Sequence, residues 1–376
     1  MFFHGKNMTA LRFIFILAAV NFTFYGMAWG TGVITFSPPP DEVYASENKA
    51  VVSRNTPVAI DTDIRNATIY YTTDGTIPTA AGIKYTSPIV ITSDTTIRAM
   101  AFYNGKGVSP LSTISYIVYS SPYDISFIIS DPSLTADFVE RDGALETKPA
   151  KKDWYKKRAF SVRNMYWGPK AKQFADIKVP QHSDKEWLRR RIIAVAARYI
   201  NAQYQYHYLI CWDPPQSWPM NSLLPVRLRH QSQGTDSSNF VSWVYNYGLG
   251  IEFTGYIKKQ AKMSSVMMPD GSTAKVRTIK GRLFKPDFDK LTGRLKMGDM
   301  VFVNTDKDKD TADHVAIWIG KDPKTGEWLV IDSYDTVSDM TDSAGNHIPT
   351  GVQIRAFRKD SFYYKGFVSA LRIIPD

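Results

Sequence analysis

Two polar residues in the second half of the chain stand where regular elements are expected to begin. Residues 234–245 (Gly-Thr-Asp-Ser-Ser-Asn-Phe-Val-Ser-Trp-Val-Tyr) have the pattern of a loop running into a helix, with Ser237 at the helix start. His314 opens residues 314–320, an apolar run typical of a strand. A serine hydroxyl can attack a carbonyl group when an imidazole takes its proton. These two side chains could therefore do nucleophilic chemistry if the fold brings them together.

The elements that must position these residues are two helices and a set of strands. One helix is predicted to begin at Ser183-Asp184 and to end near Ala202, with the arginines 189–191 at its edges. The helix that starts at Ser237 is predicted to end at Gly248 and Gly250. Strand-like runs occupy residues 298–303, 314–320, 328–333, 351–354 and 367–374. A helix on an antiparallel sheet of about five strands is an α+β fold, which we expect for residues 186–376.

An earlier part of the chain has a different pattern. Short β-like runs at residues 67–72, 89–92, 96–103 and 114–119, with Asp-Gly and Asn-Gly turns, predict an all-β sandwich, which we assign to residues 35–120. Ser37-Pro38-Pro39-Pro40 predicts a stiff linker before these runs. Residues 69–79 (Ile-Tyr-Tyr-Thr-Thr-Asp-Gly-Thr-Ile-Pro-Thr) and 85–99 resemble the Ig-like domain at the C-terminus of chitobiases and β-hexosaminidases. That resemblance implies an accessory module rather than a catalytic one. Residues 121–185 are predicted to be a basic bridge between the two domains.

Three motifs of the second half, in this order, resemble the NlpC-type cell-wall peptidases, a papain-like superfamily of cysteine hydrolases. Residues 236–240 (Asp-Ser-Ser-Asn-Phe) match the family's Asp-Cys-Ser-Gly-Phe at a helix start. Residues 298–302 match its Gly-Asp-Leu-Val-Phe strand, and residues 314–320 match the strand that opens with its catalytic His. The resemblance spans about residues 190–376. It implies a papain-like α+β fold and hydrolysis of peptidoglycan peptides.

The central departure from the family is Ser237, which stands where the family has its nucleophilic Cys. A helix N-terminus and a neighbouring His stabilise a thiolate, whereas a serine hydroxyl stays protonated at neutral pH and needs a general base. A site shaped for a thiolate also holds a hydroxyl less well. The sequence therefore predicts a hydrolase domain that is weakened or inactive. The alternative is a non-catalytic module that binds wall peptides or a protein.

The resemblance also implies the other site residues. It makes His314 the general base and places the third polar residue of the site at Asp332, with Ser333 as its competitor. Tyr204 aligns with the Tyr that precedes the family's nucleophile, and Asp236 and Ser238 flank Ser237; these three are predicted to bind substrate. Structural roles remain open for each residue. Ser237 could be only a helix N-cap, Asp332 could cap a strand or loop, and Tyr204 could be a core residue.

Cysteine and histidine usage argues against disulfides, metals and cofactors. One Cys permits no intramolecular disulfide and no Cys-rich zinc site, and the six His have no metal-ligand spacing. Asp306, Asp308 and Asp310 alternate as in a calcium loop, but Thr311 and Ile317 stand where such a loop needs Gly and Glu. We therefore expect no metal and no cofactor. The single Cys211 lies 26 residues before position 237 and is expected to be buried and inert; a displaced nucleophile is the alternative.

The N-terminus and the charge predict where the protein acts. Residues 1–30 have the pattern of an export signal, with Lys6 and Arg12 before an apolar run and Ala28-Trp29-Gly30 as a cleavage site; an uncleaved anchor is the alternative. The mature protein is expected to have no membrane span and to be secreted or periplasmic. Of the net charge of +10, +9 arises after residue 120, where 38 basic residues face 29 acidic ones. We expect peptidoglycan stem peptides or another anionic envelope polymer as the partner, rather than nucleic acid; a plain solvated surface is the alternative. The basic residues cluster at Lys148, Lys151, Lys152, Lys156, Lys157, Arg158 and Arg163.

Overall fold

The computed structural model describes residues 32–138, 182, 184–202, 204, 235–281, 287–306, 311–334 and 340–376. Four predictions fall outside these residues. They concern the export signal at 1–30, the basic cluster at 148–163, Cys211, and the aspartates Asp308 and Asp310.

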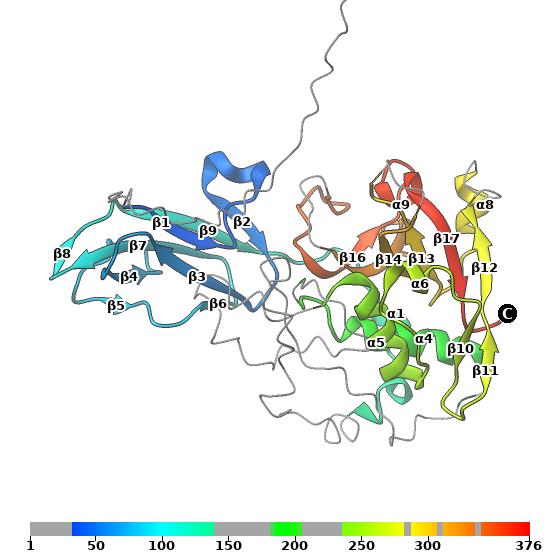
Figure 1. Ribbon diagram of the computed structural model, residues 1–376. Coiled ribbons are helices and arrows are strands. Elements are labelled where there is room, and N and C mark those ends of the chain that lie inside the picture. The colour runs from blue at the N-terminus through cyan, green and yellow to red at the C-terminus, as the bar shows by residue number, and fades with distance from the viewer. Residues whose placement is uncertain are drawn as a thin grey trace, which may run out of the picture.

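The N-terminal part is all-β, as predicted, and consists of two sheets (Figure 1). One sheet has the order β1-β3-β6, and the other has the order β2-β9-β7-β4-β5, with β8 paired to β7. Alternate residues of β7, namely Ile97, Ala99 and Ala101, are buried in the core of this part, as expected for a strand with one face inward. The bounds are β1 Ile34–Ser37, η1 Glu42–Glu47, β2 Lys49–Val52, β3 Thr56–Thr62, β4 Thr68–Thr72, β5 Ile83–Lys84, β6 Ile89–Ile91, β7 Thr95–Tyr103, β8 Lys106–Gly107 and β9 Ser112–Val118.

The prediction of a linker at residues 37–40 was wrong. Strand β1 runs through Ser37 and pairs with β3, so the sandwich begins before the prolines. The carbonyl oxygen of Pro38 accepts a hydrogen bond of 2.7 Å from the hydroxyl of the buried Tyr116. The proline segment is therefore built into the sandwich, because its backbone oxygen is needed to satisfy a core side chain.

The C-terminal part contains a sheet of six antiparallel strands in the order β12-β17-β13-β14-β15-β16. It was predicted to have about five strands. The additional strand, β12, was missed because it has only one buried apolar side chain, Ile279. A two-stranded hairpin, β10 with β11, was also not predicted. The bounds are β10 Ser265–Met267, β11 Thr273–Lys275, β12 Arg277–Lys280, β13 Met300–Val303, β14 His314–Lys321, β15 Trp328–Tyr334, β16 Gly351–Ala356 and β17 Phe367–Arg372.

Two longer helices, α4 (Lys185–Ala197) and α5 (Ser237–Leu249), pack against each other, and α5 lies on β14 and β15 (Figure 1). Their apolar side chains share one core with alternate strand residues such as Ile317 and Ile331. This arrangement confirms the α+β prediction. The short helical segments are α1 Ser126–Ile129, η2 Pro132–Leu134, α6 Ile257–Gln260, α8 Phe288–Thr292 and α9 Phe362–Lys365.

The ends of both helices differ in detail from the prediction. Asp184 caps α4 as expected. The helix ends at Ala197, earlier than predicted, and the chain forms a turn between Ala197 and Ala202. Helix α5 passes through Gly248 and ends at Leu249, and its C-cap is Gly250, which adopts the left-handed conformation with φ of 68°. Gly248 is needed for a different reason, because a Cβ at this position would lie 3.3 Å from Val195 Cγ2 of α4. The absence of a side chain lets the two helices approach closely.

The prediction that the arginines of α4 lie at its edges was wrong for Arg189 and Arg191, whereas Arg190 is half-buried. The Arg191 side chain is fully buried and forms an ion pair of 2.6 Å with Asp137. The Arg189 side chain, 5% exposed, donates hydrogen bonds to the carbonyl oxygens of Met297 and Ile374. A buried guanidinium is tolerated when its donors are paired, as they are here.

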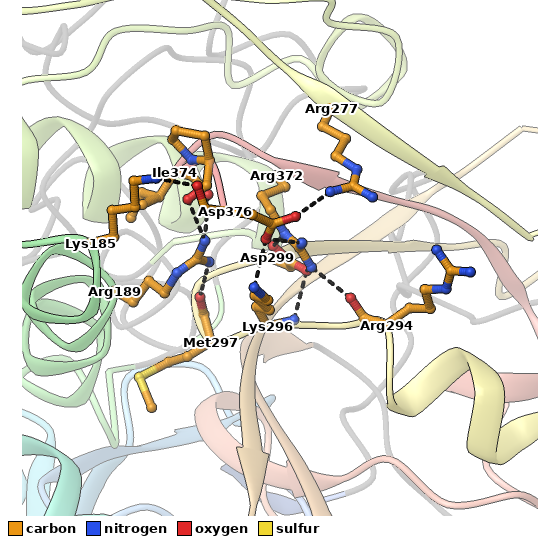
Figure 2. A network of polar contacts seen from close by, with 11 residues as sticks. Lys185, Arg189, Arg277, Arg294, Lys296, Met297, Asp299, Arg372, Ile374 and Asp376 are labelled. Carbon is orange, nitrogen blue, oxygen red and sulfur yellow. Dashed lines mark hydrogen bonds and ion pairs between the residues drawn. The ribbon is translucent and has the colours of Figure 1, made fainter.

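A network of polar contacts joins α4 to the last residues of the chain (Figure 2). At its centre the buried Arg372 forms an ion pair of 2.8 Å with the buried Asp299. Asp376 receives ion pairs from Arg372 at 2.6 Å and from Lys296 at 2.8 Å, and a further one from Arg277. These contacts fix β17 against the loop that precedes β13.

The two parts of the molecule touch directly. Gln353 Nε2 in β16 donates a buried hydrogen bond of 2.8 Å to Ser53 Oγ. The Tyr123 hydroxyl donates to Glu327 at 2.9 Å, and Tyr123 itself lies in the C-terminal core. The start of the segment predicted as a bridge is therefore packed onto the C-terminal part. None of the helices in the described ranges has the length and apolarity required to cross a membrane.

Candidate functional site

The start of α5 is fixed by Asp236. Its carboxylate accepts a hydrogen bond of 2.9 Å from the backbone N–H of Asn239, which makes Asp236 the N-cap. Ser237 is thus the first residue of the helix, and its possible role as the N-cap is excluded. Ser237 is 7% exposed. The Ser238 hydroxyl donates to the carbonyl oxygen of Gly255 at 2.6 Å, so this side chain also holds the helix start in place.

The helix start is tied to β15. The Ser333 hydroxyl donates a hydrogen bond of 2.7 Å to the carbonyl oxygen of Thr235, two residues before Ser237. Thr235 also forms a parallel β-bridge with Tyr204. Ser333 follows Asp332 directly in the strand, so this bond holds the helix start against the strand that carries Asp332.

His314 and Asp332 form a buried pair on neighbouring strands. The Nε2 atom of His314 lies 2.6 Å from Oδ2 of Asp332, and the residues are 5% and 0% exposed. Of the two candidates for the third polar residue, Asp332 contacts the imidazole while Ser333 binds Thr235, and the role of Asp332 in the site stays a prediction. Among the described residues, no hydrogen bond joins Ser237 to His314.

The Asp332 carboxylate is satisfied on both oxygens. Arg355 Nη1 in β16 contacts Oδ1 at 2.6 Å, and the Tyr363 hydroxyl in α9 donates to Oδ2 at 2.5 Å. Burial alone would raise the pKa of Asp332, but the Arg355 charge and the bonds from His314 and Tyr363 hold it below its usual value. Asp332 is therefore ionised at neutral pH.

This ionisation determines the proton position on His314. An ionised carboxylate only accepts hydrogen bonds, so His314 Nε2 must be the donor in the pair. In the neutral imidazole the other nitrogen, Nδ1, then has a free lone pair. Nδ1 is thus the atom of His314 that can take a proton from a nucleophile.

Aromatic side chains surround the His314 ring. Tyr334 contacts it edge-on with ring centroids 4.8 Å apart, and Phe362 and Tyr363 lie at 6.2 Å. Phe362 and Tyr363, together with Arg355, also line a cavity of about 190 Å³. Phe362 is half-buried and contacts both the His314 ring and the cavity.

Sequence reasoning missed Arg355 and Tyr363. A signal existed for Arg355, because a charged residue inside the apolar run of 351–356 needs a buried counter-charge. No sequence signal distinguished Tyr363 from the neighbouring aromatic residues.

Tyr204, Asp236 and Ser238 were predicted to bind substrate. The structure places all three around the helix start, and their role stays a prediction. The parts of the chain that the structure describes contain no cluster of three or more potential metal ligands.

The fold and the pair define the C-terminal part as a papain-like α+β domain with a buried His–Asp couple. Comparison with known families agrees, because residues 227–340 match the NlpC/P60 family and thus form an NlpC/P60-type domain. This family acts on peptidoglycan peptides, and its members are typically associated with the cell wall. Residues 58–116 match the family described as Fn3 associated, which is consistent with an Ig-like domain.

Comparisons with whole proteins give a distant structural match and no curated relative. The chain is similar to a solved NlpC/P60 family protein from Bacillus cereus ATCC 10987, with 11% identity and a TM-score of 0.28. The match covers 82% of this chain and 97% of that one. No match was found among curated proteins.

Proposed function

We propose that the protein is a slow serine hydrolase that cleaves an amide bond in peptidoglycan stem peptides. The observation that supports this proposal best is the buried His314–Asp332 pair, whose carboxylate is ionised and paired with Arg355. A hydroxyl nucleophile needs a general base, and a base gains most from a carboxylate that stabilises the imidazolium as it forms. The third residue of this site thus suits a serine nucleophile.

The proposed reaction uses three side chains. The Ser237 oxygen forms a bond to the carbonyl carbon of the scissile amide while its proton passes to Nδ1 of His314. Backbone N–H groups in the first turn of α5 stabilise the oxyanion. The C–N bond then breaks, the leaving nitrogen takes the proton from His314, and water hydrolyses the resulting ester. Asp332 orients the ring throughout.

The rate is expected to be low. Ser237 occupies a position that holds a Cys in related domains, and the smaller hydroxyl lies farther from its base than a thiolate would. Serine also remains protonated until the transition state. This combination predicts weak turnover rather than its complete loss.

The arrangement of the chain supports a location and a partner. We place an export signal at 1–30, an Ig-like accessory domain at 35–120, a basic segment at 121–185 and the hydrolase domain at 186–376. The protein then acts outside the cytoplasm, in the envelope, and the basic residues hold it on anionic wall polymers. Residues 1–30 and most of 121–185 lie outside the described residues, so these assignments rest on the sequence alone.

The test compares three proteins on muropeptides, with released products detected by mass spectrometry. The native chain should give slow hydrolysis, Ser237→Ala should reduce the rate at least about 100-fold, and Ser237→Cys should raise it. Ser242→Ala is a matched control, because Ser242 lies on the same helix, is buried, and among the described residues its hydroxyl bonds only to the carbonyl oxygen of Asn239 in that helix. Native activity that survives in Ser237→Ala would contradict the proposal.

A non-catalytic binding module is the second candidate. The observation in its favour is that no hydrogen bond joins Ser237 to His314 in the described part of the chain. It predicts that the native protein binds muropeptides without cleaving them. Gain of hydrolysis only in Ser237→Cys, with no turnover by the native protein, would favour this candidate.

A further inference from the structure

The pair that carries the proposed function has two further partners. Arg355, 1% exposed, contacts Oδ1 of Asp332, and Tyr363, 1% exposed, donates to Oδ2. In the described part of the chain, neither side chain forms a hydrogen bond or ion pair with Ser237, and both reach His314 chiefly through the carboxylate. Their position is therefore one step behind the pair.

Arg355 is itself held in place. Its Nη2 atom donates to the carbonyl oxygens of Pro349 at 2.9 Å and Gly351 at 3.3 Å, where the chain enters β16. The guanidinium is planar and presents its donors in a fixed fork, so these bonds fix the direction of Nη1 towards Asp332. A lysine at this position would keep the charge but lose the fork.

Tyr363 shares an acceptor with His314. Both bind Oδ2 of Asp332, at 2.5 Å for the phenol and 2.6 Å for the imidazole. Burial raises the pKa of Tyr363 well above its usual value, and the Asp332 charge adds to this rise, so the phenol stays protonated and remains a donor. The two donors approach one oxygen from different elements, α9 and β14, which limits the orientations open to the carboxylate.

We propose that Arg355 and Tyr363 are positioning residues that act through Asp332, holding its carboxylate so that His314 keeps its proton on Nε2 and presents Nδ1 to the nucleophile. This inference rests on the proposed function for its meaning in catalysis. The position of the proton on the His314 ring, however, can be measured whether or not the protein turns over substrate. The groups that face the imidazole are Asp332 and Tyr334 from β15 and Phe362 and Tyr363 from α9.

The test is nitrogen NMR of the full chain labelled with ¹⁵N-histidine, because the nitrogen shifts distinguish the two tautomers. The chain has six His, and the His314→Gln variant identifies the signals of His314. In the neutral form of the imidazole, the native protein should show the His314 proton at Nε2 alone. Tyr363→Phe and Arg355→Lys should each populate the second tautomer, and Arg355→Met should do so further.

Two variants serve as matched controls. Arg358 lines the same cavity and forms an ion pair of 2.5 Å with Glu327 rather than with Asp332, so Arg358→Lys should leave the His314 signals unchanged. Tyr364 neighbours Tyr363 but packs on Phe288 and Phe357, so Tyr364→Phe should also leave them unchanged. Hydrolysis, measured on the same samples, should fall about 10-fold in Tyr363→Phe. The rate should be lowest in Arg355→Met and higher in Arg355→Lys, though still below the native rate.

The outcomes separate the two claims. If His314 keeps the Nε2–H tautomer in folded Tyr363→Phe and in folded Arg355→Lys, the positioning role is overturned, whatever the activity. If the tautomer shifts as expected but native hydrolysis is absent, the positioning role holds and the proposed function fails. Tyr363→Phe removes a single oxygen atom and is expected to fold, so it tests the positioning role even if the Arg355 variants do not fold.

Discussion

At the scale of single residues, the site depends on how Asp332 is kept ionised in a fully buried position. A lone carboxylate there would take up a proton, because burial penalises its charge. Arg355 supplies the opposite charge, and His314 and Tyr363 supply donors. The carboxylate can therefore act on the imidazole at neutral pH, which a neutral aspartic acid could not do.

Asp332→Asn is predicted to lower hydrolysis at least about 100-fold, because the amide leaves His314 without a charged partner. It also leaves Arg355 buried without its counter-charge, which costs about 3–5 kcal/mol in the free energy of unfolding. Urea unfolding and the muropeptide assay measure the two effects. An Asn variant with native activity would contradict the role of the carboxylate.

The lowered pKa of Asp332 also makes the free energy of unfolding depend on pH. Its pKa is lower in the folded state than the value of about 3.9 expected for an unfolded chain. The unfolded state thus binds the proton more readily, so the stability from this group is complete above pH 4 and is lost as the pH falls through the folded pKa. Urea midpoints between pH 2 and 6 should fall more steeply for the native protein than for Asp332→Asn.

At the scale of elements, the position of Ser237 is set by the first turn of α5. Asp236 caps the helix, Ser333 holds Thr235, and Gln260 donates to the carbonyl oxygen of Ser238 at 3.0 Å. The helix start is thus bound from the loop, from β15 and from α6. This bracing keeps the nucleophile position fixed relative to the strand that carries Asp332.

Asp236→Ala is predicted to destabilise the protein by about 1–2 kcal/mol and to lower hydrolysis as well, because the cap and the start of α5 are lost together. Asp184→Ala is the matched control. Asp184 caps α4 through the same type of bond, 2.9 Å to the N–H of Glu186, far from Ser237 in the chain. It should lower stability by about 1 kcal/mol and leave hydrolysis unchanged. Equal loss of activity in both variants would argue against a local role for the cap.

At the scale of the whole molecule, the sandwich is docked on the C-terminal part rather than merely attached to it. Ser53 and Gln353 bond across the contact, and Asp41 lies 3.9 Å from the buried His347. The loop that contains His347 continues through Pro349 and Gly351, the residues that hold Arg355. The contact therefore supports the loop behind the site.

Scanning calorimetry should accordingly show one transition for the native protein. Ser53→Arg places a charge in the buried contact, where it costs several kcal/mol, and should split the melting curve into two transitions. Ser93→Arg, the same substitution at an exposed position of the sandwich, should leave a single transition. Two transitions in the native protein would show that the parts unfold independently.

Much of this organisation could be predicted from the sequence, for identifiable physical reasons. The apolar runs at 314–320 and 328–333 are continuous because both faces of those strands are buried, and Gly250 marks the end of α5 as predicted, whereas the N-cap is Asp236 and not Ser237. The buried arginines of α4 could not be predicted, since their partners, such as Asp137 and the carbonyl oxygen of Ile374, are far away in the chain. Arg355 and Tyr363 were missed for the same reason, because their partner Asp332 is brought to them only by the fold.

The measurement that tests the central claim most directly is the reaction of the native protein with a fluorophosphonate. An activated serine displaces fluoride from such a reagent and forms a stable bond to phosphorus. Intact-mass and peptide mass analysis should show one adduct, on Ser237, that is absent in Ser237→Ala and strongly reduced in His314→Gln. If Ser237 stays unmodified while a known serine hydrolase in the same sample is labelled, the account of Ser237 as a nucleophile is contradicted.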